Sequence, residues 1–422
     1  MLHKFKRIWD IKDLRNSMIF VLLMLVIFRL AAHIPVPGVN PEGLSQFLQG
    51  NQILGLLNVF SGGTLENFSI AMLGVAPYIT SAIIFQLLVL IVPRLEEMQK
   101  EGQAGQQKIN MYTRVATVPL AMLQAFGLIK LLSQSGQNII PSLNSWTFIG
   151  ITLVVTAGTV FLMWIGELIT EKRIGNGISL LILAGIIAAL PRLVQNAIVN
   201  YTPADLYTYI LFLFIAIATI IGVVFISEGQ RNIPVHYARQ GGGRAVGAAQ
   251  SHLPLRVNTA GVIPIIFAIS ILIFPQTVAQ FFVSGSGWTA ELALFVSELF
   301  GNQLFYGILY FVLVFGFTYF YTAVIFHPHK VAENLQRQGG FIPGIRPGKE
   351  TEEYIAKTMS RLVFVGAVFL GGVAILPLIV QLVTNSQSLV VGGTGLLIVV
   401  AVAIDIAKQI EAQVTLHEYN RV

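Results

Sequence analysis

The stretch SGGTLENFSIAMLGVAPYIT, residues 61–80, is apolar enough to enter a membrane but too interrupted to form an ordinary spanning helix. Its interruptions are small, polar or helix-breaking residues, namely Ser61, Gly62, Gly63, Glu66, Asn67, Gly74 and Pro77. Paired glycines allow a hinge, and proline fits the first turn of a helix. The pattern indicates a half-helix. A surface helix on the outer leaflet is the alternative that the pattern leaves open.

The composition of the whole chain indicates a membrane protein. Of its 422 residues, 55% are hydrophobic and 11% are charged, whereas soluble domains carry about 25% charged residues. The absence of cysteine excludes disulfides, thiolate metal sites and cysteine nucleophiles. The N-terminus has the basic start and apolar run of a signal peptide, but the run contains Arg29 and lacks a small-x-small cleavage site. We expect it to be retained as the first span.

Ten apolar stretches are candidate spanning helices, since a membrane crossing needs about 20 mostly apolar residues. Their cores are residues 17–33, 70–92, 115–132, 147–169, 178–190 (extending to about 199), 206–227, 259–283, 303–326, 361–384 and 389–407. The fifth is the weakest, because Pro191 and Arg192 interrupt it. The expected fold class is an all-α polytopic membrane protein with ten transmembrane helices.

The basic residues are distributed asymmetrically between the connections of these spans. Of the 26 Lys and Arg residues, all but Arg29, Lys130 and Arg192 fall on one side, which the positive-inside rule assigns to the cytoplasm. Both termini are then cytoplasmic. The chain divides into residues 1–200 and 201–422 with five spans each, and an odd number requires the two halves to be inverted. Inverted repeats place a functional path between the halves, near the bilayer midplane.

Two connections on the cytoplasmic side, about residues 228–258 and 327–360, are long and combine Arg with Gly and Pro turn signals. Basic residues beside spans are expected from topology and from attraction to anionic lipids. That attraction explains less well why the loops are long. We therefore interpret both loops as docking surfaces for a cytosolic partner. A basic surface also suits ribosomal RNA, which it would contact through phosphates.

Catalytic signatures are missing from the sequence, which has no HExxH, Walker A or GxSxG motif. His327 and His329 lie in a basic loop without further ligands nearby, so we interpret them as an interfacial pair. The few charged residues within spans, Arg29, Glu167 and Asp405, lie near predicted membrane faces. An ion-coupled transporter is the main alternative, and a dependence of transport on Na⁺ or H⁺ would favour it. An intramembrane enzyme would need a polar cluster at the midplane.

Branched apolar residues recur at helical spacing in two spans. Ile79 and Ile83 share one face of a helix, and Ile182 and Ile186 repeat the spacing. From spacing alone, such residues are expected to face lipid or the core. A ring of them would form a hydrophobic constriction that blocks ions and water by dewetting.

Five segments are long and distinctive: FSGGTLENFSIAMLGVAPYIT (60–80), ITEKRIGNGISL (169–180), AAQSHLPLRVNTAGVIP (248–264), ENLQRQGGFIPGIRPG (333–348) and GGTGLLIVV (392–400). In this order, over nearly the whole chain, they resemble signature segments of the bacterial SecY family. Members of that family are the channel subunits of Sec protein-translocation complexes. The resemblance implies two inverted five-helix halves around a central hourglass pore.

The resemblance also implies the parts of the pore. A plug, about residues 61–73, would enter the channel from outside as a half-helix, and the second spanning helix would resume at Gly74. Glu66 and Asn67 would face water in the outer funnel. The plug residues carried over are Ser61, Gly62, Gly63, Glu66, Asn67 and Phe68. The pore ring at the waist would consist of Ile79, Ile83, Ile182, Ile186, Ile266 and Ile398. Unreactive branched side chains suit a channel whose substrates share no sequence.

A lateral gate is implied between spans 2–3 and 7–8, through which hydrophobic signal sequences leave into lipid. Asn258 matches a polar gate position, although an ordinary helix cap would also explain it. Arg346 is the first candidate for a critical docking contact, followed by Arg239, Arg244 and Arg256. The segment GRAVGAAQ departs from the family pattern, which leaves the contacts of its loop open.

The implied function is a passive, gated channel in the bacterial inner membrane, without enzymatic activity or cofactor. It would pass unfolded precursors outward and release transmembrane segments sideways into lipid. The implied partners are SecE and usually SecG in the membrane, the SecA ATPase or the ribosome at the cytosolic face, and anionic lipids. Because the sequence contains no nucleotide-binding motif, a partner must supply the energy.

Overall fold

The computed structural model describes residues 11–36, 44, 61, 63–65, 67–134, 144–199, 206–237, 250–283, 287–384 and 388–419. Each of the ten predicted spans falls on one of its helices. In the first half these are α2 (Lys12–Ala31), α5 (Ala76–Ile91), α7 (Gln103–Gln134), α8 (Ser145–Glu171) and α9 (Gly177–Val199). In the second they are α10 (Leu206–Glu228), α11 (Ile263–Phe282), α13 (Gln303–Ile325), α15 (Lys349–Thr384) and α16 (Ser388–Tyr419).

Within the described residues, six helices are long and apolar enough to cross a membrane alone: α2, α7, α8, α10, α13 and α15. Helix α5 passes together with α6 (Pro93–Lys100), and the two are bent by 98°. The apolar parts of α9 and α11 are shorter and end at Pro191 and Pro275. Helix α9 nevertheless continues through Pro191 to Val199, which matches the expected extension of this span to about residue 199. Proline is tolerated inside a membrane helix where neighbouring groups satisfy the freed backbone carbonyl.

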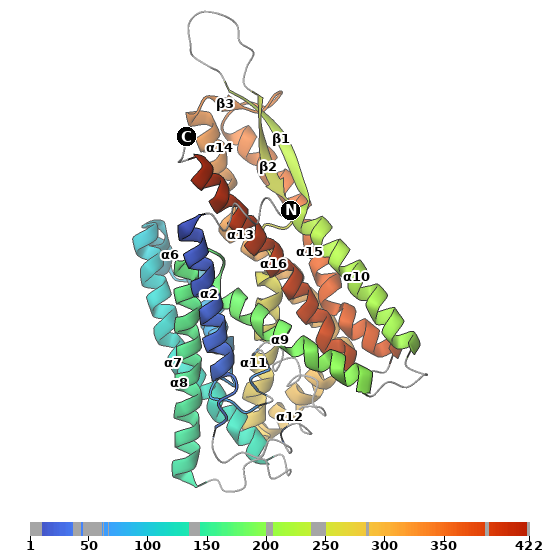
Figure 1. Ribbon diagram of the computed structural model, residues 1–422. Coiled ribbons are helices and arrows are strands. Elements are labelled where there is room, and N and C mark those ends of the chain that lie inside the picture. Colours follow the sequence, from blue (N-terminus) through green and yellow to red (C-terminus); the bar gives the residue numbers. More distant parts are fainter. Residues whose placement is uncertain are drawn as a thin grey trace, which may run out of the picture.

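The helices pack in two groups that meet through α11 and α16. Helix α7 lies against α5 and α8, and α8 lies against α2 and α9. Likewise α15 lies against α13, α16 and α10, and α11 lies against α13. Contacts between the groups run from α11 to α5 and α7, and from α16 to α9. In Figure 1, α2, α7 and α8 form one flank, α10 and α15 the other, and α9, α11 and α16 lie between them.

The two long connections, predicted to be turn-rich loops, fold into one lobe. Strands β1 (Gln230–Tyr237) and β2 (Gln250–Arg256) pair antiparallel, and β1 also pairs with β3 (Gly340–Phe341). Helix α14 (Pro328–Arg337) and the start of α15 complete this β lobe. Its core consists of Ile233, Val235, Leu255, Leu335, Ile342, Ile355, Met359 and Val363. In Figure 1 the lobe projects from the end of the bundle where the C-terminus lies.

Candidate functional site

The segment of residues 61–75 is folded as a series of turns in its described part, and helix α5 begins only at Ala76. The predicted half-helix and the predicted helix start at Gly74 are therefore wrong. The reason is local, because Gly63, Phe68 and Gly74 have φ values of 75°, 41° and 57°, which a right-handed helix excludes. Pro77 lies in the first turn of α5, as predicted. Gly62 and Glu66 lie outside the described residues.

Hydrogen bonds fix this segment internally and to the end of α2. The Thr64 hydroxyl donates to the Ser61 carbonyl at 2.9 Å, and the Ser69 hydroxyl donates to the Thr64 carbonyl at 3.1 Å. Residues 34–36 run antiparallel to residues 68–70, joined by Val36 N–H to Phe68 O at 2.9 Å and Ile70 N–H to Ile34 O at 3.0 Å. The half-buried Asn67 amide donates to the carbonyl of Ala32 at 3.5 Å.

The side chains of the segment are buried against the C-terminal half of α7 and the N-terminal half of α8. One hydrophobic cluster contains Leu65, Phe68, Met72 and Leu73 of the segment, Ala125, Leu128, Ile129 and Leu132 of α7, and Ile151 and Val155 of α8. The backbone also approaches α8 closely, since a Cβ added to Gly158 would collide with the carbonyl of Ile70. Glycine at position 158 therefore allows the segment to lie directly on the helix.

The six isoleucines of the predicted pore ring are all buried in one hydrophobic cluster. Ile79 and Ile83 come from α5, Ile182 and Ile186 from α9, Ile266 from α11 and Ile398 from α16. The cluster is larger than this ring and also draws on α13 and α15. Ala71 and Val75 of the 61–75 segment belong to the same cluster. The segment therefore connects the cluster at the isoleucines to the cluster on α7 and α8.

Asn258 lies in the turn that precedes α11 and is almost fully buried. Its amide group donates to the carbonyl of Gly261 at 3.3 Å, and Gly261 has a positive φ of 62°. The side chain thus stabilises the turn, whereas the N-cap of α11 is Val262, which has no capping side chain. The Asn258 Oδ1 atom is buried and has no hydrogen-bond partner among the described residues. Beside it, the hydroxyls of Thr259 and Thr322 lie 3.3 Å apart and connect this turn to α13.

The basic docking candidates lie on the β lobe as far as they are described. Arg239 and Arg244 lie outside the described residues, and Arg256 is the exposed last residue of β2. Arg346 is exposed in the turn after β3. Its backbone is fixed, because its N–H donates to Glu350 Oε2 at 3.4 Å and its carbonyl accepts from the Thr351 hydroxyl at 2.8 Å.

His327 and His329 precede and begin α14. Across the described residues, no group of three or more potential ligands is arranged to hold a metal ion. His329 Nδ1 instead lies 3.0 Å from Glu352 Oε2 of α15. This hydrogen bond and the charge of the carboxylate raise the pKa of His329 above its ordinary value of 6.5.

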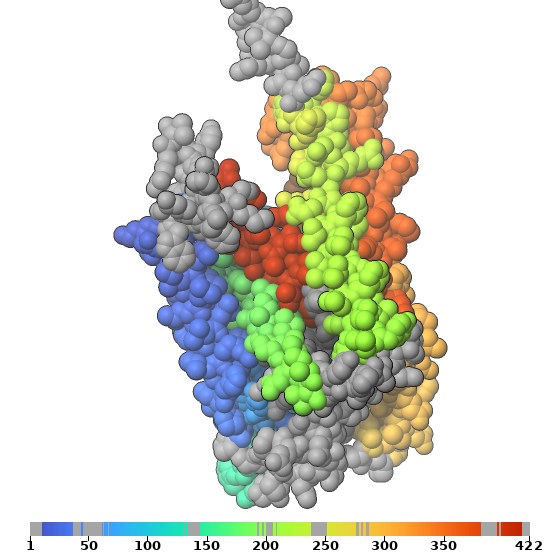
Figure 2. Space-filling view, turned by 45° about the vertical axis from the view of Figure 1, so that its right-hand side comes forward, coloured from blue at the N-terminus to red at the C-terminus, as the bar shows by residue number. Residues whose placement is uncertain are grey.

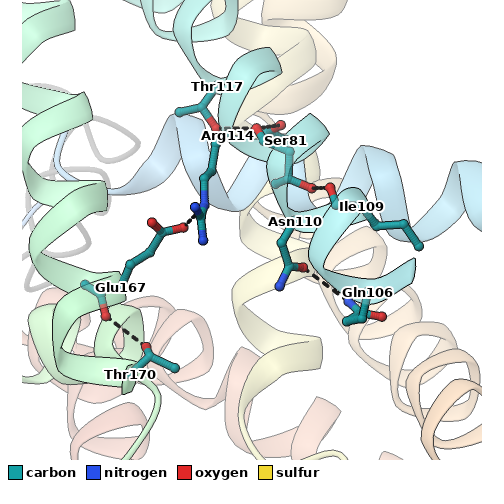
Figure 3. Close-up of polar contacts among 10 residues, drawn as sticks. Ser81, Gln106, Ile109, Asn110, Arg114, Thr117, Glu167 and Thr170 are labelled. Atoms are coloured by element: carbon teal, nitrogen blue, oxygen red, sulfur yellow. Dashed lines mark hydrogen bonds and ion pairs between the residues drawn. The ribbon is translucent and has the colours of Figure 1, made fainter. Parts of the chain in front are cut away.

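The sequence analysis did not predict a group of polar contacts between α5, α7 and α8. The Ser81 hydroxyl of α5 donates to the carbonyl of Thr113 on α7 at 2.7 Å, and Arg114 forms an ion pair with Glu167 of α8. Figure 3 shows the Arg114 guanidinium extended toward the Glu167 carboxylate. The cluster ties α5 to α7 and α7 to α8. The sequence offered only two charges on different predicted helices, with no signal that they meet.

This arrangement is that of a polytopic helical membrane protein, and comparisons with known proteins define its class further. A solved structure of a protein-conducting channel aligns with a TM-score of 0.62 and 16% identity, covering 93% of this chain and 91% of that one. Canine Sec61 in a ribosome–channel complex aligns with a TM-score of 0.59 and 15% identity, over 93% and 91% of the two chains. These likenesses establish the fold.

Sequence relationships identify the family. The family model described as SecY matches residues 69–407. The protein translocase subunit SecY of Halalkalibacterium halodurans is 46% identical over 100% of this chain and 99% of its own. The corresponding subunit of Pseudomonas aeruginosa is 45% identical over 95% and 91% of the two chains. The chain belongs to the SecY family, whose members are protein-translocation channels and not enzymes.

Proposed function

We propose that the described structure is the resting state of a pore between the two five-helix halves, residues 1–200 and 201–422. Unfolded precursors pass outward through this pore across the bacterial inner membrane. The observation that carries the proposal is the burial of six isoleucines from four helices of both halves in one cluster. Such side chains close on one another when the pore is empty and exclude water and ions by dewetting. Because these side chains offer no hydrogen bonds or charges, a precursor chain of any sequence can slide past them without being bound.

The 61–75 segment is the plug of this pore in our proposal. Its turns place Ala71 and Val75 against the cluster that contains the isoleucines, and its larger side chains against α7 and α8. A precursor that enters the waist would have to displace the segment and expose those side chains. Exposure of apolar surface costs free energy, so the segment favours the sealed state until a substrate occupies the pore.

The lateral gate lies, in our proposal, where α11 meets α5 and α7. Helix α11 is in contact with both α5 and α7, which fits a closed gate. Opening requires α11 and α13 to move away from α5 and α7. The turn around Asn258 is a suitable hinge because it combines a positive φ at Gly261 with a buried Oδ1 atom that lacks a partner among the described residues. Transmembrane segments of precursors then leave sideways into lipid.

A groove between the halves is the proposed site of SecE. Figure 2 shows a hollow between α2 and α10, with α9 and α16 at its floor. Only 11% of the apolar window of α10 and 22% of that of α2 are buried, the lowest shares among the six spans. At one end Lys408 of α16 pairs with Glu228 of α10 at 2.9 Å. A helical subunit such as SecE would cover the exposed apolar faces and join the halves, with SecG as a further membrane partner.

The β lobe is the proposed docking surface for a cytosolic partner, either the SecA ATPase or the ribosome. Its three strands and α14 hold Arg346 on a fixed backbone with an exposed side chain. The guanidinium forms no ion pair with any described residue and is therefore available to an acidic group. With the N-terminus and the lobe on the cytoplasmic side, the remaining basic residues attract anionic lipids.

A disulfide test addresses the pore directly, because the chain has no cysteine of its own. One Cys replaces Ile83, and a second is placed in the mature part of a precursor stalled by a folded domain. We expect an efficient disulfide at Ile83→Cys and little at Ile84→Cys, which lies one residue further along α5 and is exposed. Equal crosslinking at both positions, or none at Ile83→Cys with the precursor still engaged, would place the translocating chain elsewhere.

A further inference from the structure

Helix α12 (Trp288–Gly301) joins α11 to α13 and belongs to none of the predicted spans. With 14 residues it measures about 21 Å along its axis, too short to cross the hydrocarbon core. It packs on α11, and its buried residues are the small Ala290 and Ala293. Figure 1 places it at the end of the bundle opposite the β lobe.

The face of α12 that points away from α11 is apolar and uncovered. Trp288, Leu292 and Phe295 are spaced by four and three residues, so they share one face of the helix. Their exposed fractions are 73%, 50% and 60%. Glu291 and Glu298 are also exposed and lie together along one edge of this stripe. A helix with an apolar stripe beside charged residues is amphipathic, as is expected at a boundary between lipid and water, although its charges here are acidic.

The spanning helix that follows α12 also carries an exposed apolar row. Leu304, Ile308 and Val312 form an exposed row on α13, spaced by four residues. Asn302 joins the two helices rigidly, because its side chain accepts hydrogen bonds from the N–H groups of Leu304 and Phe305 at 3.0 and 3.3 Å. The exposed row on a spanning helix faces lipid, so a neighbouring stripe at the end of that helix meets the same bilayer.

We propose that α12 is an interfacial helix whose stripe of Trp288, Leu292 and Phe295 inserts into the outer leaflet beside the gate. Tryptophan favours the level of the lipid headgroups, and the acidic edge favours zwitterionic over anionic lipid because like charges repel. Since α12 is packed on α11 and joined to α13, it fixes the depth of both helices while the gate opens. The placement in the outer leaflet rests on the orientation given under the proposed function.

Site-directed spin labelling tests the inference in the complete channel complex, reconstituted in vesicles of phosphatidylcholine and phosphatidylethanolamine. Single nitroxides are attached at Leu292→Cys and Phe295→Cys, and, as matched controls on the same helix, at Glu291→Cys and Glu298→Cys. Collisions with oxygen report lipid exposure, and collisions with a water-soluble nickel chelate report water exposure. We expect the oxygen-to-nickel ratio to be several-fold higher at 292 and 295 than at 291 and 298, and similar to that at Leu304→Cys.

Two results would overturn the inference. Equal nickel accessibility at all four positions would mean that the stripe faces water. Immobilised labels at 292 and 295 that neither reagent reaches would mean that a protein covers the stripe. The orientation is tested separately, by labelling Glu298→Cys with a membrane-impermeant maleimide from either side. Reaction only from the cytoplasmic side would contradict the proposed topology, while the accessibility pattern would still decide whether α12 is interfacial.

Discussion

Replacing Phe68 tests whether packing of the 61–75 segment keeps the resting channel sealed. Phe68 is 1% exposed and belongs to the cluster on α7 and α8. Truncating a buried Phe to Ala costs about 3–5 kcal/mol. If displacement of the segment exposes this ring to the water-filled funnel, the truncation destabilises only the sealed state and leaves the free energy of the open state unchanged. At 1.4 kcal/mol per factor of ten, about 3 kcal/mol would raise the open probability of the empty channel about 100-fold.

The backbone at this position provides a second, finer comparison. Phe68 has a φ of 41°, a conformation that Gly adopts freely and Ala does not. Phe68→Gly loses the same packing but relieves strain of roughly 1 kcal/mol in the sealed state, which is about a fivefold difference in open probability. The ion leakage is therefore expected to be lowest in the parent, higher in Phe68→Gly and highest in Phe68→Ala.

Single-channel recording in planar bilayers, with no precursor present, measures these open probabilities. Ile355→Ala is the matched control, because Ile355 is fully buried in the distant β lobe and its loss should leave the conductance unchanged. Thermal stability of each purified variant shows whether it is folded. A folded Phe68→Ala channel with the same open probability as the parent would refute the reasoning, since the ring would then contribute nothing to the seal.

Three further predictions concern charged residues. Arg346→Glu should abolish translocation driven by SecA while the thermal midpoint stays unchanged, and normal precursor transport into vesicles would show that this exposed side chain is not a docking contact. Glu167→Gln should destabilise the complex by on the order of 1–2 kcal/mol, because the partly buried ion pair with Arg114 is lost; Glu96→Gln, at an exposed pair with Lys100, should change the melting temperature little. His329 has a raised pKa in the folded chain, so its pairing with Glu352 is complete below pH 6.5 and is lost as the pH rises through that raised value. The protection of α14 against hydrogen exchange, relative to the intrinsic rate at each pH, should therefore fall over this range in the parent but not in His329→Gln. Identical pH profiles of protection would contradict the assignment.

The parts of the fold that follow from hydropathy were predictable. A membrane span needs only a long apolar run, so all ten predicted cores fall on helices. Ile79 and Ile83, and Ile182 and Ile186, were flagged by their spacing, but spacing cannot distinguish lipid from core. That these residues meet Ile266 and Ile398 in one cluster depends on tertiary contacts, and their position in the family pattern was the only sequence signal for it.

The features that could not be predicted depend on backbone φ angles or on contacts between segments far apart in the sequence. The turns of residues 61–75 follow from positive φ angles, one of them at Phe68, where no composition rule would predict it. The β lobe joins segments about a hundred residues apart in sequence, and its strand β1 contains Pro234, which is unfavourable in a paired strand. The ion pair of Arg114 and Glu167 joins two helices in the same way. Local sequence patterns do not indicate which distant segments pair with one another.

The ladder between residues 34–36 and 68–70 has a kinetic consequence. The 61–75 segment is covalently continuous with α5 and hydrogen-bonded to the chain that follows α2. In the proposed channel a precursor displaces this segment, which stays covalently attached, so its return is an intramolecular step at a high effective concentration. Reclosure should then be a first-order process that is independent of how many channels the membrane contains. In the proposed channel, a covalently attached segment would therefore restore the barrier to ions as soon as the end of the precursor has passed.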